Sequence, residues 1–186
     1  MPEHRTLEAS SDIAALDQIL EVDGLDIVDV GCGAGNLSRE LVQRGARVLG
    51  VDPDAIQAAK NRQAPTEAGL QFAEAPATAL PLDGNSQDGV VMSRSLHHVA
   101  IDEMEPALRE AARVLKPTGF LYVLEPAYAG SYWDLQESFN NESPARLAAI
   151  ETLDRVAPSL FGEMQEYWYD LPVRFPDFEN FLETML

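Results

Sequence analysis

The sequence predicts one doubly wound α/β domain with a mostly parallel, Rossmann-like sheet. Short apolar segments alternate with amphipathic ones over residues 25–126, which is typical of strands joined by crossover helices. A glycine-rich turn follows the first apolar segment, and an aspartate ends the second. With 186 residues, the chain has the length of a single domain with a sizeable core.

The first elements follow from spacing and from residues that begin or end helices. Residues 10–21 carry apolar residues at helical spacing behind a Ser-Ser-Asp cap. Residues 27–30 form a short apolar run that stops at glycines, which predicts a buried strand. A helix is expected over 36–44, a second strand over 47–52 and a second helix over 54–63.

The alternation continues through the middle of the chain. We expect strands at 70–75, 88–95 and 119–126, and a helix at 102–115 with one apolar face. The last of these strands is almost entirely apolar, as in a sheet that is covered on both faces.

The segment after residue 126 has a different composition. Residues 127–169 are too long for a simple connection, and they predict a helical insertion with two helices. This insertion is either a lid over a substrate or a packed helical subdomain. Residues 166–175 form a candidate strand, and residues 177–186 predict a short helix. The insertion is rich in aromatic side chains: Tyr128, Tyr132, Trp133, Phe139, Phe161, Tyr167, Trp168 and Tyr169.

Composition excludes several classes of function. The net charge is −18 and the chain has only two lysines, which disfavours binding to nucleic-acid phosphates or anionic membranes. No apolar run approaches the roughly 20 residues that span a bilayer, and the polar N-terminus lacks a secretory signal, so we expect a cytoplasmic protein. Cys32 is the single cysteine, and the three histidines show no metal-binding spacing, so no metal is predicted.

The sharpest local signal is the turn from Asp29 to Asn36, with glycines at 31, 33 and 35. Glycines at alternate positions let the backbone turn tightly and approach a ligand closely. The spacing departs from the G-x-G-x-x-G dinucleotide fingerprint, whose third glycine would be due at Asn36. Asp52, at the end of the next strand, can accept hydrogen bonds from ribose hydroxyls, although a strand-end turn residue is the alternative.

Four segments together resemble the class I methyltransferases, particularly the small-molecule enzymes related to quinone biosynthesis. These segments are DVGCGAGNLSREL, VLGVDPDAIQAAK, ALPLDGNSQDGVVMSRSLHHV and LREAARVLKPTGFLYVLEP. The resemblance implies that S-adenosylmethionine is the cofactor and S-adenosylhomocysteine the product. It divides the single domain, 1–186, into an N-terminal helical segment (1–24), a cofactor-binding core (25–126) and a lid or substrate region with a C-terminal strand and helix (127–186).

The resemblance also implies roles for single residues. The loop residues Gly31, Cys32, Gly33 and Gly35 would lie beneath the cofactor, with Asp29 supporting the loop and the amino end of the cofactor. Asp52 would bind the ribose, Pro53 would lie near the adenine, and Ser93, Arg94 and Ser95 would face the methionine. An acidic residue that contacts adenine in this family is replaced by Pro76, which leaves Glu74 or the backbone of Ala77 as candidates.

His97 and His98 are the candidates for a general base. Imidazole titrates near working pH, and a base is needed only if the methyl acceptor must lose a proton. On an extended strand the two side chains would face opposite ways, so only one would reach the reaction pocket. The alternative is one histidine packed in the core and one in solvent.

The predicted function is methyl transfer to a small-molecule acceptor by in-line displacement, with Tyr128 as the candidate substrate contact. The alternative is a non-catalytic, methyltransferase-like binding subunit that activates a partner. The resemblance implies a reversed strand pair at the end of the sheet, and the chain has little room for its last strand. The C-terminal edge of the sheet is therefore expected to be incomplete unless a homodimer or another partner chain covers it.

Overall fold

Five parallel strands form the central sheet in a computed structural model that describes residues 4–65, 67–127, 141–172 and 175–185. Their order across the sheet is β4-β3-β2-β5-β6, and every neighbouring pair is parallel. This arrangement confirms the predicted doubly wound fold. The strands are β2 (Asp26–Val30), β3 (Arg47–Asp52), β4 (Leu70–Glu74), β5 (Gln87–Ser93) and β6 (Leu115–Leu124).

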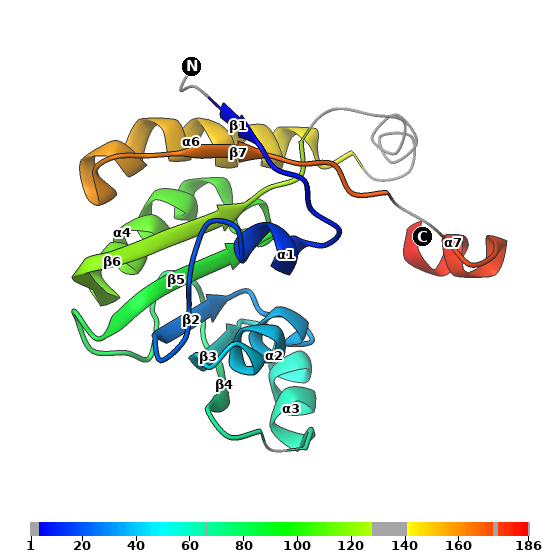
Figure 1. Cartoon of the computed structure of the whole chain (residues 1–186), viewed down its shortest axis with the longest axis horizontal. Helices are drawn as coiled ribbons and strands as arrows, with labels where there is room; N and C mark the ends of the chain where they lie inside the picture. The colour runs from blue at the N-terminus through cyan, green and yellow to red at the C-terminus, as the bar shows by residue number, and fades with distance from the viewer. Residues whose placement is uncertain (1–3, 66, 128–140, 173–174, 186) are drawn as a thin grey trace.

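Helices cover both faces of this sheet (Figure 1). On one face, α4 (Met104–Val114) and α6 (Ser143–Phe161) bury their apolar side chains against β2 and β5. On the other face, α1 (Asp12–Leu16) and α2 (Asn36–Gln43) pack on β2 and β3. The helix α3 (Ala55–Gln63) packs against β3 and β4. Covering both faces explains why the central strands are almost continuously apolar.

The helix expected over 10–21 is shorter than predicted. Ser11 caps it by accepting a hydrogen bond from the backbone N–H of Ala14. The α-helix ends at Leu16, after which Gln18 and Ile19 donate to carbonyls three residues earlier. The apolar residues that follow Leu16 at helical spacing therefore lie in tight turns and not in an α-helix.

The candidate strand at 166–175 forms only at β7 (Glu166–Trp168), and it does not join the central sheet. It pairs in parallel with β1 (His4–Thr6), and a further hydrogen bond runs from Leu7 N to Trp168 O at 2.7 Å. The pair forms a two-stranded sheet of its own, which lies apart from the central sheet in Figure 1. Among the described residues β6 pairs with β5 alone, so the outer edge beside β6 lacks a further strand there.

The C-terminal helix expected over 177–186 is α7 (Phe178–Met185). Of the two helices expected in the insertion, α6 is described, and residues 128–140 lie outside the described part of the chain. None of the helices in the described ranges combines the length and apolar character needed to cross a membrane.

Candidate functional site

The turn between β2 and α2 is a glycine loop whose backbone is hydrogen-bonded to the neighbouring strand β3. The backbone N–H groups of Gly31 and Cys32 both donate to the carbonyl of Val51, at 2.8 and 3.0 Å. Gly31 has φ 72°, and a Cβ at this position would lie 2.5 Å from the Cβ of Ser95. Only glycine combines this backbone conformation with so close an approach of the next strand end.

Gly33 lies on the open side of the same loop. A Cβ built there would meet nothing within 4 Å, and the backbone again has a positive φ, 50°. Its N–H donates to Asp52 Oδ2 at 2.9 Å, and its carbonyl accepts from Asn61 Nδ2 at 2.7 Å. The loop is therefore fixed by β3 and α3 while its outer surface stays accessible to a ligand.

Asp29 lies beneath this loop and is almost fully buried, with 2% of its surface exposed. Its Oδ2 accepts a hydrogen bond of 2.5 Å from the Ser38 hydroxyl, which ties the end of β2 to the first turns of α2. Burial raises the pKa of Asp29 to about 6, with a further upward contribution from the nearby Asp52 carboxylate. This geometry places Asp29 beneath the loop, and its supporting role toward the cofactor stays a prediction.

The Asp52 carboxylate spans the gap between the glycine loop and the start of α3. Its Oδ2 accepts from Gly33 N and its Oδ1 from Asp54 N, both at 2.9 Å. Each carboxylate oxygen has two lone pairs, so Asp52 can still accept two hydrogen bonds from a diol. Asp54 caps α3 by accepting from the N–H groups of Ile56 and Gln57, which orients the whole turn.

The predicted adenine side lies next to Asp52. Glu74 pairs in register with Asp52 across β4 and β3, so the two carboxylates end adjacent strands on the same side of the sheet. Pro76 is exposed and Ala77 is half-buried against the core. The structure thus brings Glu74 to Asp52, while the roles of Pro53 and Ala77 remain predictions.

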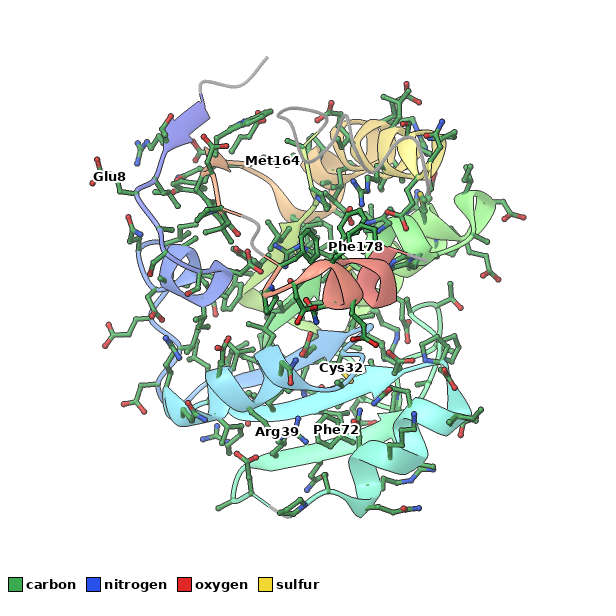
Figure 2. All side chains as sticks on the ribbon, turned by 90° about the vertical axis from the view of Figure 1, so that its right-hand side faces the viewer. Glu8, Cys32, Arg39, Phe72, Met164 and Phe178 are labelled. Carbon is green, nitrogen blue, oxygen red and sulfur yellow. The ribbon has the colours of Figure 1, made fainter. Side chains whose placement is uncertain are left out.

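Cys32 is half-buried between the loop and α3, where the Asn61 amide contacts its sulfur. Burial, followed by the charges of Asp29 and Asp52, raises the pKa of its thiol to about 12, so the thiol stays protonated and unreactive at neutral pH. Figure 2 shows Arg39 and Phe72 on neighbouring elements; the Arg39 guanidinium lies 5.4 Å from the centre of the Phe72 ring.

The end of β5 carries the second group of predicted residues. Ser95 is buried, and its hydroxyl donates to the Val30 carbonyl at 2.7 Å, so its side chain fastens the glycine loop to β5. Ser93 is half-buried at the last position of β5. Arg94 has a positive φ of 53° and forms an ion pair with Asp12 of α1. The Tyr169 hydroxyl also donates to Asp12, at 2.9 Å.

His97 and His98 lie in a short 3-10 helix, η1 (Leu96–His98), so the expectation of an extended strand here is wrong. The tight helical turn places the two rings side by side, with centroids 4.1 Å apart, instead of on opposite faces. His97 is buried and His98 is exposed. Partial desolvation of the ring, followed by the charge of the neighbouring His97, holds the pKa of His98 below its usual value.

Two glutamates far along the chain complete this cluster. His97 Nδ1 bonds to Glu125 Oε2, and the side chains of both residues are more than nine-tenths buried. Glu142 Oε2 lies 4.0 Å from His97 Nε2 and 2.5 Å from an Arg146 nitrogen. The sequence could have pointed to Glu125, because it is the single charged residue in the otherwise apolar segment FLYVLEP. Nothing in the local sequence singles out Glu142, so a search for metal-binding spacing among the histidines missed it.

The structure therefore brings the predicted residues together in two groups, one at β2 and β3 and one at β5 and β6. Both groups lie at the carboxyl ends of the parallel strands, where sheets of this topology bind ligands. Tyr128, the predicted substrate contact, lies outside the described residues.

Comparison with known proteins agrees with this geometry. The family described as methyltransferase domain matches residues 28–123. An uncharacterized methyltransferase of Mycobacterium bovis is 38% identical over 112 residues, which cover 58% of this chain and 42% of that protein. A ubiquinone biosynthesis O-methyltransferase of Bartonella tribocorum is 31% identical, covering 56% of this chain and 42% of its own length.

Solved structures agree as well. The crystal structure of an S-adenosylmethionine-dependent methyltransferase from Mesorhizobium loti is 32% identical, with a TM-score of 0.55, covering 62% of this chain and 53% of that one. The chain thus spans about half the length of the proteins it matches. The family match covers more than half of this chain. This chain therefore belongs to the methyltransferase domain family and has the Rossmann-like fold of the class I methyltransferases.

Proposed function

We propose that this protein is an S-adenosylmethionine-dependent methyltransferase that acts on a small-molecule acceptor. The observation that carries the proposal is the loop at Gly33, which faces open space while Asp52 holds it from behind. A ligand with a ribose diol fits this arrangement, because Asp52 keeps acceptor positions free on both oxygens.

The chain's own residues would bind and orient the reactants. The glycine loop gives the cofactor a surface without side chains, and Ser95 and Asp29 hold that surface in place. When bound, S-adenosylmethionine supplies an activated methyl group and a good leaving group, so the main task of the protein is alignment. Arg94, directly after the neighbouring strand β5, would face the methionine part of the cofactor, and His97 and His98 would lie at the rim of the reaction pocket.

The net charge of the chain and the names of its relatives support the proposed acceptor class. A net charge of −18 disfavours a polyanionic acceptor such as nucleic acid. The relative from Bartonella tribocorum is named for O-methylation in ubiquinone biosynthesis, which supports a small organic acceptor for this chain too. A general base, if the acceptor requires one, would be His97 or His98.

Calorimetric titration tests the cofactor assignment without knowledge of the acceptor. We expect S-adenosylmethionine and S-adenosylhomocysteine to bind the purified chain at micromolar concentration, and NAD not to bind. Asp52→Ala removes charge-assisted hydrogen bonds worth about 1.5–3 kcal/mol each, so we expect affinity to fall roughly 100-fold or more.

The matched control is Asp102→Ala, which removes an exposed carboxylate from a different part of the chain. It should bind both ligands as the wild type does. A folded wild type that binds neither ligand would overturn the proposal and favour the non-catalytic binding subunit. Equal affinities in the wild type and Asp52→Ala would overturn the role of Asp52.

A further inference from the structure

We propose that His97, His98 and Glu142 bind a divalent transition-metal ion, with Zn²⁺ as the natural occupant. One ligand atom from each side chain lies within 4.8 Å of the other two. The cluster joins η1, which follows β5, to the residue that caps α6, and α6 begins on the side toward which the strand arrows point (Figure 1). Its three residues are not among those that form the glycine loop.

The orientation of His97 is the first argument for a metal site. Glu125 binds this residue twice, because Oε2 bonds to the ring Nδ1 and Oε1 accepts the backbone N–H at 3.2 Å. A carboxylate that accepts from Nδ1 leaves the lone pair on Nε2, and Nε2 faces Glu142. Histidines that bind metals are usually held in this way, with the other ring nitrogen donating to a carboxylate.

The ligand set is the second argument. Two imidazoles and one carboxylate suit first-row transition ions, and three protein ligands leave a fourth position of a zinc tetrahedron open. At metal–ligand distances of about 2.0–2.2 Å, tetrahedral ligand atoms lie roughly 3.3–3.5 Å apart. His97 Nε2 and Glu142 Oε2, now 4.0 Å apart, need to approach by well under an ångström.

The side chains that must move to bring the three ligand atoms together are the more exposed ones. His97 is buried and clamped, whereas His98 is exposed and Glu142 is only partly buried, so these two side chains can adjust around the fixed ring. Arg146 competes for Glu142 through an ion pair of 2.5 Å. The pair uses Oε2, the same oxygen that faces His97 Nε2, so a metal would have to share this oxygen with Arg146 or displace the pair, at a cost in affinity.

The consequence for the reaction rests on the proposed function. An ion with an open coordination position at the end of β5 would polarise an acceptor hydroxyl and lower its pKa, which would make a protein base unnecessary. Metal binding itself needs neither the cofactor nor the acceptor. The two proposals can therefore fail separately.

The experiment is a titration of the full, tag-free and chelator-treated chain with Co²⁺, followed by displacement with Zn²⁺. We expect one equivalent of Co²⁺ to give the visible absorption bands of a tetrahedral or five-coordinate site, and Zn²⁺ to abolish them. His98→Ala and Glu142→Gln should each weaken binding at least tenfold, and Glu125→Gln should weaken it about 10–100-fold through loss of ring orientation.

The chain's third histidine provides the matched control, since His4→Ala should keep the full absorption signal. Circular dichroism melting confirms that each variant is folded. Absence of Co²⁺ bands up to millimolar metal in the folded wild type would overturn the proposal. Bands of equal strength in wild type, His98→Ala and Glu142→Gln would also overturn it, because the ion would then be bound elsewhere.

Discussion

The two halves of the ligand-binding edge are built in different ways. At β2 and β3, the carboxylates beneath the loop have partners nearby in sequence: Asp29 bonds to Ser38, nine residues away, and Asp52 to Gly33, nineteen residues away. The outer fastenings of the loop, from Asn61 and Ser95, do come from 28 and 65 residues away. At β5 and β6 the partners are distant, because Glu125 is 28 residues from His97 and Tyr169 is 157 residues from Asp12. The first half is built mainly on β2, the turn, α2 and the following strand β3, and the second is an assembly of separate segments.

This difference separates two physical roles. Backbone hydrogen bonds and glycines fix the first half, so its shape is set mainly by the local chain. Side-chain hydrogen bonds and ion pairs hold the second half, so it can change as segments move or as ligands bind. The following three experiments test this distinction, from the largest expected effect to the smallest.

Alanine substitutions at two loop glycines should show how strongly the close approach of Ser95 constrains the loop. Gly31→Ala combines a left-handed backbone with a Cβ 2.5 Å from Ser95, which together cost roughly 2–5 kcal/mol. Gly33→Ala meets no atom within 4 Å and incurs only the backbone cost, about 1–2 kcal/mol. Differential scanning calorimetry should show a clearly larger fall in Tm for Gly31→Ala.

A second-site change provides the control for this pair. Ser95→Gly removes the atoms that the new Cβ would meet, so Gly31→Ala should cost less stability in that background. Equal Tm losses for Gly31→Ala and Gly33→Ala would mean that the approach of β5 to the loop does not constrain this half of the edge.

The buried carboxylate of Asp29 makes the local half sensitive to pH. Its pKa is raised from 3.8 to about 6, so the folded state binds a proton more tightly than the unfolded state does. The free energy of unfolding should therefore fall as pH rises through this window, by at most about 3 kcal/mol for a shift of roughly two units. Asp29→Asn has no carboxylate to titrate here and should lack this pH dependence, while its amide oxygen can still accept a hydrogen bond from Ser38.

Urea unfolding of Asp29→Asn and wild type at several pH values measures the effect. The stability of the variant relative to wild type should increase between pH 4 and pH 7. Asp102→Asn, at an exposed position, controls for the general loss of a negative charge. A difference between Asp29→Asn and wild type that stays constant across this range would contradict the raised pKa.

The same division explains what the sequence could predict. Strand β3 has the bounds that its apolar run predicts, and the loop glycines all have positive φ, because both features depend on short segments. The pair of histidines could not be placed in this way. Their relative orientation depends on a 3-10 turn. Their partners are Glu125, the residue after β6, and Glu142, the N-cap residue of α6. Pairings of that kind are set by packing of the whole domain.

The smallest expected effect concerns the distant half, at the contact between Tyr169 and α1. Tyr169→Phe removes the hydroxyl that donates to Asp12, a loss of about 1 kcal/mol for a partly buried hydrogen bond. Tyr167→Phe is the matched control, since its hydroxyl bonds only to the exposed Gln165 two residues away among the described contacts. Hydrogen exchange should show faster opening of residues 12–16 in Tyr169→Phe alone. If both variants exchange as the wild type does, α1 is held by its own buried apolar side chains, Ile13 and Leu16, and the distant half of the edge is as locally determined as the glycine loop.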